Sequence, residues 1–365
     1  MSIIEGRTMG EINPRASRVQ SGRWTVLILL FGLVGVGVAS ISMGTLETGL
    51  ADVLGSVVHG MTGGRWPIGV DSRIATVVLE IRLPRLLVAL SVGASLGVAG
   101  ACLQGMFRNP LADPGLIGVS SGGAIGSILA IASLGILAPT GGLLAELHIP
   151  LWAIAGSIAT TFTVYRIARI AGKTHISTLL LAGIAVNALA GAVVGAVLYI
   201  SDNDALRRFT FWTLGSLGTS TWRSWFLMLP FIAVPMVILP RYRTALNAFL
   251  LGEAEAYHLG FNTQQVKRVV ISLCSLMVGV TVAFCGLIGF VGLVVPHLVR
   301  MLWGPDFRRL MPISGLMGAL LVTAADLLAR TVNAPSEIPI GVVTSLVGAP
   351  FFLYLIYRRK RQLSV

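Results

Sequence analysis

Long apolar runs alternate with short polar segments along almost the whole chain. Most of these runs have about 20 residues, which is the length that an α-helix needs to cross a hydrocarbon layer of about 30 Å. The pattern therefore predicts an all-α, polytopic membrane protein with about ten transmembrane helices. The expected helices cover residues 23–43, 84–106, 117–137, 151–170, 176–200, 222–240, 269–285, 286–303, 310–329 and 341–357.

The N-terminal segment is the first polar region. Residues 1–22 are expected to form a flexible cytoplasmic tail, and residues 23–365 a single transmembrane domain. Within the tail, IEGR at residues 4–7 resembles a protease recognition sequence. Residues 1–8 are therefore a candidate addition to the natural chain.

Four other polar segments are expected on the outer side of the membrane, and one of them is TVNAPSEIPI at residues 331–340. Residues 44–83 and 138–150 are expected to be external connections. Residues 201–221 are expected to form an external loop that contains a short helix, with Asp202 or Asp204 near its N-terminus.

Composition supports a lipid environment. The chain is 55% hydrophobic and only 12% charged, whereas a soluble domain carries about 25% charged residues. The 43 glycines suit close packing between membrane helices, because small residues let two backbones approach. Cys102, Cys274 and Cys285 lie inside apolar runs without CxxC spacing, so free, packed thiols are expected.

The distribution of charge indicates orientation rather than nucleic-acid binding. The net charge is +12, but the basic residues stand at the ends of apolar runs instead of forming a single patch. Nineteen of the 27 Lys and Arg residues fall in segments expected on the inner side, which predicts that both termini are cytoplasmic. Residues 84–110 and 267–293 share a small-residue pattern and would enter the membrane from opposite sides, which predicts an inverted pseudo-repeat.

The longest polar interruption in the second half is RYRTALNAFLLGEAEAYHLGFNTQQVKR, at residues 241–268. Basic residues bracket it at both ends, as is typical of a cytoplasmic segment. Gly252 and Gly260 offer places to turn, so two short helices are expected on the inner surface. They could be bound by a soluble partner protein, or they could form an ordinary amphipathic loop that rests on lipid headgroups.

The inventory of reactive side chains argues against an enzyme. Within the expected spans no HExxH motif and no paired carboxylates occur, and no metal site is predicted. No Walker A sequence occurs either, so the energy source is expected on a separate ATPase that docks near residues 252–260. Asp326 is the one carboxylate expected within a span, and a local i,i+4 pair with Arg330 at the outer helix end and a role in transport both remain open.

Arg82 and Arg85 flank Pro84 at the expected outer end of a membrane helix. Most basic residues of the chain are expected on the inner side, so these two depart from the general bias. Outer arginines can guide the docking of an acidic soluble partner. They can equally contact lipid phosphates or form local ion pairs, and both readings remain open at this point.

Several stretches resemble one family, the FecCD-type permeases of ABC importers for iron–siderophores, haem and cobalamin. The resemblance covers residues 45–357 and is carried by NPLADP, TLLLAGIAV, LGEAEAYHLG, GLIGFVGLVVPHLVRM and EIPIGVVTSLVGAPFFLYL. It implies a non-catalytic subunit of the bacterial inner membrane that forms a homodimer around a central path. It also implies two cytoplasmic ATP-binding subunits that use the ATP, a periplasmic binding protein, and transport by alternating access.

The resemblance also assigns roles to residues. By matching position, it implies ATPase coupling at Leu251, Gly252, Glu253, Ala254 and Gly260, binding-protein docking at Arg82, Arg85 and Arg330, an inner gate at Ile176 and Ser177, and a path lined by Asn187. The family often has small hydroxyl residues at both gate positions, and Ile176 departs from that pattern.

The segment DALRRFTFWTLGSLGTSTW looks most like the haem-importing members. Arg207 and Arg208 could meet haem propionates, while Phe209, Phe211 and Trp212 offer apolar surface. The same residues could instead anchor a short external helix at the membrane interface. Haem is therefore the expected substrate, a ferric siderophore and cobalamin are alternatives, and no covalently bound cofactor is expected. An ATPase-independent channel or carrier is the competing class.

Overall fold

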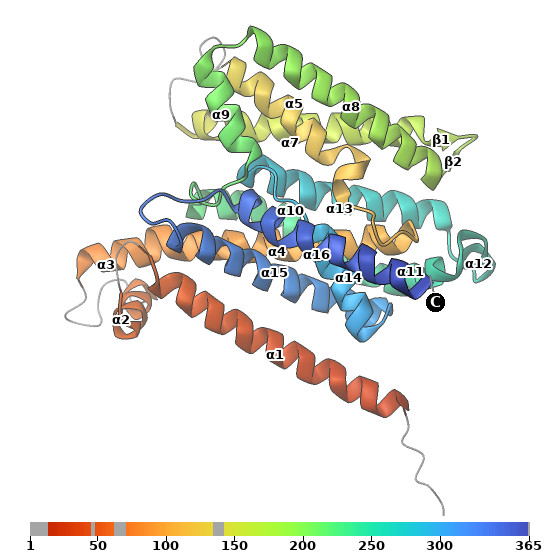
Figure 1. Ribbon diagram of the computed structural model, residues 1–365, viewed down its shortest axis with the longest axis horizontal. Helices are drawn as coiled ribbons and strands as arrows, with labels where there is room; N and C mark the ends of the chain where they lie inside the picture. Colours follow the sequence, from red (N-terminus) through yellow and green to blue (C-terminus); the bar gives the residue numbers. More distant parts are fainter. Residues whose placement is uncertain (1–13, 45–47, 62–70, 134–141, 364–365) are drawn as a thin grey trace, which may run out of the picture.

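The structure is a computed structural model that describes residues 14–44, 48–61, 71–133 and 142–363. Its helices run largely side by side, and these residues hold one small sheet, the antiparallel pair β1–β2 (Figure 1). In chain order the elements of the first half are α1 (Pro14–Ser42), α2 (Leu50–Met61), α3 (Ser72–Thr76), the π-helical turn η1 (Val77–Arg82), α4 (Leu83–Met106), η2 (Pro114–Ile117), α5 (Val119–Ala132), α7 (Gly142–Ile167), β1 (Arg169–Ile170) and β2 (Lys173–Thr174). The second half holds α8 (Ile176–Ile200), α9 (Asn203–Thr213), α10 (Trp222–Ile238), η3 (Leu239–Tyr242), α11 (Arg243–Leu251), α12 (Glu253–His258), α13 (Thr263–Cys285), α14 (Val291–Trp303), α15 (Phe307–Thr331) and α16 (Ile340–Leu363).

The predicted all-helical membrane architecture is confirmed. Within the described residues, seven helical segments are long and apolar enough to cross a membrane, and three more apolar helices are shorter. The seven are Trp24–Ser42, Ser72–Met106, Leu144–Ile167, Ile176–Ile200, Trp222–Leu251, Thr263–Cys285 and Phe307–Thr331. The shorter three are Val119–Ala132, Val291–Trp303 and Ile340–Tyr354, so each of the ten predicted spans has a helix.

The start of the second span differs from the prediction. The connection expected at residues 44–83 contains α2, α3 and η1, and the membrane helix begins at Ser72 rather than Pro84. Pro84 does not end this helix, because a π-helical turn precedes it and the N–H of Leu83 bonds back to the carbonyl of Val78. The wider turn accommodates a residue that cannot donate a backbone hydrogen bond.

Two further boundaries shift. Helix α1 begins at Pro14, inside the segment expected to be a flexible tail, and α7 begins at Gly142, inside the connection expected at residues 138–150. Residues 1–8 lie outside the described part of the chain. The expected short helix is present as α9, and the Asp202 carboxylate caps it by accepting from the N–H of Ala205 at 2.8 Å.

Small residues set how closely the central helices pack. Helices α4 and α15 meet where a Cβ added to Gly93 would lie 2.2 Å from the carbonyl oxygen of Gly318. Helices α5 and α7 meet in the same manner at Gly122 and Gly156, where an added Cβ on Gly122 would lie 2.3 Å from the Gly156 oxygen. These contacts explain how the glycine-rich composition is used, since any side chain there would force the backbones apart.

The main hydrophobic core lies between α4, α13, α14 and α15, and α1 runs along its outer side (Figure 1). Helices α5, α7 and α8 form a second layer on the opposite side of α13 (Figure 1). Cys102, Cys274 and Cys285 are free and buried, which confirms the prediction of packed thiols.

Candidate functional site

A cavity of about 500 Å³ lies between the two layers of helices. Asn187, from α8, lines it beside Ser121 of α5. Ser121 Oγ donates to Asn187 Oδ1 at 2.6 Å, and Asn187 Nδ2 donates to the carbonyl of Gly115 at 3.1 Å. The residue expected to line a path thus faces a cavity, and its amide is oriented by bonds on both sides.

Two features of this cavity were missed by sequence reasoning. One is Asp113, which lines the cavity and caps the turn η2 by accepting from the N–H of Gly115 at 2.7 Å. The other is a break in the helix, because α13 ends at Cys285 and α14 starts only at Val291.

The break corrects the span expected at residues 286–303. Gly286 has φ 71° and Phe290 has φ 66°, so the backbone turns out of helical geometry at both ends of the GLIGF segment. All five residues of this segment line the cavity. Irregular backbone at membrane depth is tolerated where it lines a cavity, and the two glycines in GLIGF were the available signal.

The expected inner gate lies at the start of α8. Ile176 is the first residue of this helix and packs partly buried against the main core, whereas Ser177 is exposed. Directly before them, the β1–β2 hairpin connects α7 to α8. The gate assignment stays a prediction.

The polar stretch at residues 241–268 forms the two short helices predicted for it. Helices α11 and α12 lie beside the start of α13 at one end of the molecule (Figure 1). Gly252 joins them with φ 152°, and a Cβ added there would lie 1.8 Å from Glu255 Oε2. At the other end of α12, Gly260 adopts φ 89°.

This pair of helices presents apolar side chains outward. Leu251, Tyr257 and Leu259 are 65%, 68% and 61% exposed, and Ala254 is exposed as well. Exposed apolar groups in a cluster are typical of a surface that another protein covers. The coupling role of this surface stays a prediction.

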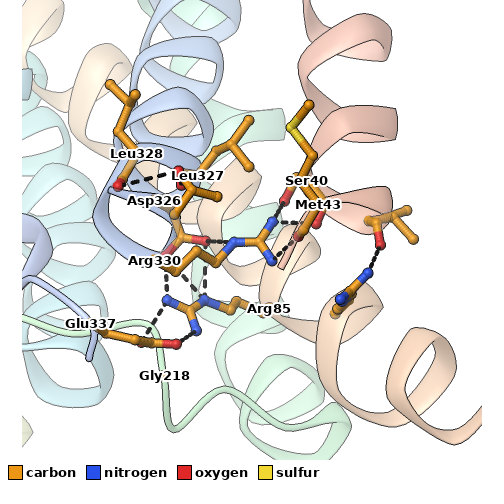
Figure 2. Close-up of polar contacts among 12 residues, drawn as sticks. Ser40, Met43, Arg85, Gly218, Asp326, Leu327, Leu328, Arg330 and Glu337 are labelled. Atoms are coloured by element: carbon orange, nitrogen blue, oxygen red, sulfur yellow. Dashed lines mark hydrogen bonds and ion pairs between the residues drawn. The ribbon is translucent and has the colours of Figure 1, made fainter. Parts of the chain in front are cut away.

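The three arginines expected on the outer side, Arg82, Arg85 and Arg330, are buried. Figure 2 shows the polar contacts of Arg85 and Arg330. The guanidinium of Arg85 bonds both Asp326, at 2.8 Å from Nη2 to Oδ1, and Glu337, at 2.7 Å from Nη1 to Oε1. Arg330 Nε lies 3.8 Å from Asp326 Oδ2, so the expected i,i+4 pair exists but is the longer contact. The principal partner of Asp326 is therefore Arg85, on another helix.

The remaining hydrogen bonds of the network connect it to the C-terminal end of α1. Arg330 donates to the carbonyls of Ser40 and Met43, and Arg82 donates to the carbonyls of Ile41 and Ser42. Glu337 is the partly exposed member, since 43% of its side chain is accessible. The hydrogen bond from Arg85 lowers the pKa of Glu337 below its ordinary value, despite partial desolvation of the carboxylate. Docking by Arg82, Arg85 and Arg330 stays a prediction.

The residues considered for substrate contact lie on α9. Arg208 pairs with Asp204 at 3.1 Å, and the Arg207 guanidinium lies 5.9 Å from the centre of the Phe211 ring. Phe209 and Trp212 stack at 5.9 Å between ring centres and pack on α5 and α8. Phe209 and Trp212 thus anchor the helix, while Arg207, Arg208 and Phe211 are exposed.

A helical membrane body with an internal cavity and a broken helix beside that cavity has the architecture of a membrane transport protein. Residues 28–358 match the model of the FecCD transport family, and the chain belongs to this family. The chain is accordingly a multi-pass membrane permease subunit that catalyses no reaction itself, and ATP hydrolysis belongs to a separate subunit.

Individual relatives span nearly the whole chain. The chain is 42% identical to the hemin transport system permease protein HmuU of Yersinia pestis, covering 93% of this chain and 95% of that protein. It is 41% identical to the cobalamin import system permease protein BtuC of Halobacterium salinarum, over 80% and 76% of the two chains. A solved inward-facing metal-chelate type ABC transporter superposes with a TM-score of 0.78 at 33% identity, over 91% of this chain and 98% of that one.

Proposed function

We propose that this chain is the permease of an ATP-driven importer of haem. The observation that carries the proposal is the 42% identity to a hemin permease along 93% of the chain. The similarity to a metal-chelate type transporter supports a chelated metal as cargo. Because cobalamin permeases match at 41% identity, cobalamin is the second candidate.

The proposed mechanism is alternating access in a homodimer in the bacterial inner membrane. Two copies of the chain enclose a central path, and each contributes the cavity beside Asn187. Two cytoplasmic ATP-binding subunits close on ATP and move the helices, so that the cavity opens to one side at a time. In this scheme Ile176 and Ser177 close the inner end of the path.

Docking of the ATP-binding subunits is proposed at α11 and α12. The exposed side chains of Leu251 and Tyr257 would bury apolar surface in a groove of the partner. Gly252 and Gly260 adopt positive φ angles and form the turns at the two ends of α12. Glu253 remains 41% exposed although it contacts Lys267, so one face of its carboxylate is free to contact the partner.

Docking of a periplasmic binding protein is proposed at the outer arginines. All three arginine residues are less than a tenth exposed, so an acidic partner would first meet the rim of the network. At that rim Glu337 holds the Nη1 and Nη2 atoms of Arg85. A carboxylate of the binding protein could replace Glu337 there without leaving Arg85 unpaired.

For haem itself, α9 supplies the candidate contact. Arg207 and Arg208 are exposed cations, and Phe211 is 56% exposed. A propionate group suits the cations, and the porphyrin ring suits the aromatic face.

The experiment is import into proteoliposomes that contain the permease, its ATP-binding subunit and, outside, its binding protein. Hemin should stimulate ATP hydrolysis and accumulate in an ATP-dependent manner. Accumulation of cobalamin or of a ferric siderophore in place of hemin would reassign the cargo. Full-rate uptake by vesicles that hold the permease alone would contradict the ATP-driven class.

A further inference from the structure

Lys267 lies near the start of α13 with a side chain that is only 1% exposed. A buried ammonium group requires compensating partners, because its removal from water is energetically unfavourable. Two partners are present. Lys267 Nζ donates to Glu253 Oε1 at 2.6 Å and also to the backbone carbonyl of Thr174. One buried charge therefore joins α12 to the β1–β2 hairpin.

Gln264, one turn earlier on α13, makes a parallel pair of contacts. Its Oε1 accepts from the N–H of Thr174 at 2.8 Å, and its Nε2 donates to Glu253 Oε1 at 3.2 Å. Both backbone polar groups of Thr174 are thus held by side chains of α13. Both of these side chains also contact the same carboxylate oxygen of Glu253.

The hairpin leads directly to the start of α8. Thr174 is the last residue of β2, and Ile176, two positions later, is the first residue of α8. The residue between them, His175, is tied back by a hydrogen bond from its N–H to the carbonyl of Ala168 at 3.0 Å. A displacement of Thr174 therefore reaches Ile176 through a single constrained residue.

Helix α13 also reaches the cavity. Val278, Thr281 and Val282, farther along this helix, line the space beside Asn187. The same helix therefore holds the Glu253 and Thr174 contacts at one end and forms part of the cavity wall at the other.

We propose that Lys267 is a positioning residue that links helix α12 to the start of α8, by holding Glu253 and Thr174 on one ammonium group. The inference rests on the proposed function, in which α12 seats in the ATP-binding subunit and Ile176 closes the inner end of the path. Movement of α12 pulls Glu253, and Lys267 and Gln264 pass the displacement to Thr174. Lys267 acts through these groups and touches no substrate.

The test uses Lys267→Met in the complete complex, reconstituted with the ATP-binding subunit and the binding protein. Methionine has a similar length but no charge and no donor. ATP hydrolysis should stay within about twofold of the unmodified complex, whereas hemin imported per ATP hydrolysed should fall at least tenfold. A spin label on Ser177→Cys measures the distance between the two chains, and ATP should no longer change that distance in the Lys267→Met complex. The native cysteines are buried, so the label is directed to the exposed position 177.

Gln264→Leu and Gln265→Leu form a matched pair of variants. Gln264 contacts Thr174 and Glu253, whereas the neighbouring side chain of Gln265 is exposed. Gln264→Leu should lower import per ATP by about threefold to tenfold, and Gln265→Leu should leave it unchanged. Where Lys267→Met reduces the yield of folded complex, Gln264→Leu decides between the outcomes.

Unchanged import per ATP and an unchanged label response in the Lys267→Met complex would overturn the inference. That result leaves the proposed function intact, because the unmodified complex still imports in an ATP-dependent manner. Failure of the proposed function shows itself separately, as import by the unmodified permease without its ATP-binding subunit.

Discussion

Arg85 on α4 and Asp326 on α15 are 241 positions apart in the sequence and form a bidentate ion pair (Figure 2). Arg85 Nη2 lies 2.8 Å from Asp326 Oδ1, and Arg85 Nε lies 3.0 Å from Oδ2. The Asp326 side chain is 1% exposed, so this carboxylate is the fixed centre of the network. The pair connects two helices that also pack closely through Gly93 and Gly318.

Replacing Asp326 with Asn should destabilise the protein strongly. The substitution leaves Arg85 and the nearby Arg330 without their shared buried carboxylate. Breaking a buried pair from one side costs about 3–5 kcal/mol. Thermal unfolding of the purified protein in detergent measures the loss.

The matched control for this substitution is Glu337→Gln, at the exposed edge of the same network. It keeps a hydrogen-bond acceptor for Arg85 and should cost no more than about 1 kcal/mol. Equal losses for the two variants would show that burial of Asp326 does not set the strength of the network.

The stability of the folded protein should depend on pH through the Glu337 carboxylate. Arg85 lowers the pKa of Glu337 in the folded protein, so folding favours the ionised form. This contribution is fully present above the ordinary Glu pKa of about 4.3 and is lost as pH falls through the lowered folded value. The melting temperature should therefore drop less on acidification from about pH 6 to about pH 3 in Glu337→Gln than in the unmodified protein.

Salt supplies the control for the acid experiment. Glu337 is 43% exposed, so its pair with Arg85 is screened by solvent, and high salt should shrink the difference between the two proteins. Identical acid dependence at low salt would show that this carboxylate does not contribute.

Much of the helical architecture could be predicted from hydropathy alone, because each membrane helix must supply a long apolar run. The turn at Gly252 could also be predicted from the sequence, since this glycine separates two short helical segments. The burial of Arg85 could not be predicted from the sequence, because a charged residue at the end of a helix is usually exposed to solvent. Only the fold brings Asp326 and Glu337 to it.

The broken helix shows a second limit of the sequence. GLIGF at residues 286–290 is apolar throughout, so hydropathy continues across it without interruption. Its backbone nevertheless leaves helical geometry at Gly286 and Phe290, which both have positive φ. Gly348 faces the Phe290 side chain, and a Cβ there would lie 2.4 Å from the Cβ of Phe290. This contact joins two segments that are far apart in the sequence, so the two glycines of GLIGF are the local signal of the break.

Gly318→Ala should disturb the contact between α4 and α15. A Cβ on Gly318 would lie 2.2 Å from the carbonyl oxygen of Gly93, and the opposing atom is backbone that cannot turn aside. Overpacking of this kind typically costs about 1–3 kcal/mol. Thermal unfolding in detergent should therefore show a lower melting temperature.

Gly35→Ala on α1 is the control for this glycine contact. No atom lies within 4 Å of a Cβ added at Gly35, and alanine is the better helix former by about 1 kcal/mol. The melting temperature should be unchanged or slightly higher. A loss at Gly35 equal to that at Gly318 would mean that close packing is not the cause.

Tyr257→Asp should detach the ATP-binding subunit without unfolding the permease. The Tyr257 side chain is 68% exposed on α12, so its replacement disturbs little inside the chain. In the complex an apolar contact would become a buried, unpaired carboxylate, which costs several kcal/mol. Co-purification of the ATP-binding subunit should fall at least tenfold while the melting temperature of the permease alone stays the same. Ala256→Asp, at a buried position on the same helix, should instead lower that melting temperature. Normal recovery of the ATP-binding subunit with Tyr257→Asp would move the docking surface away from the exposed face of α12.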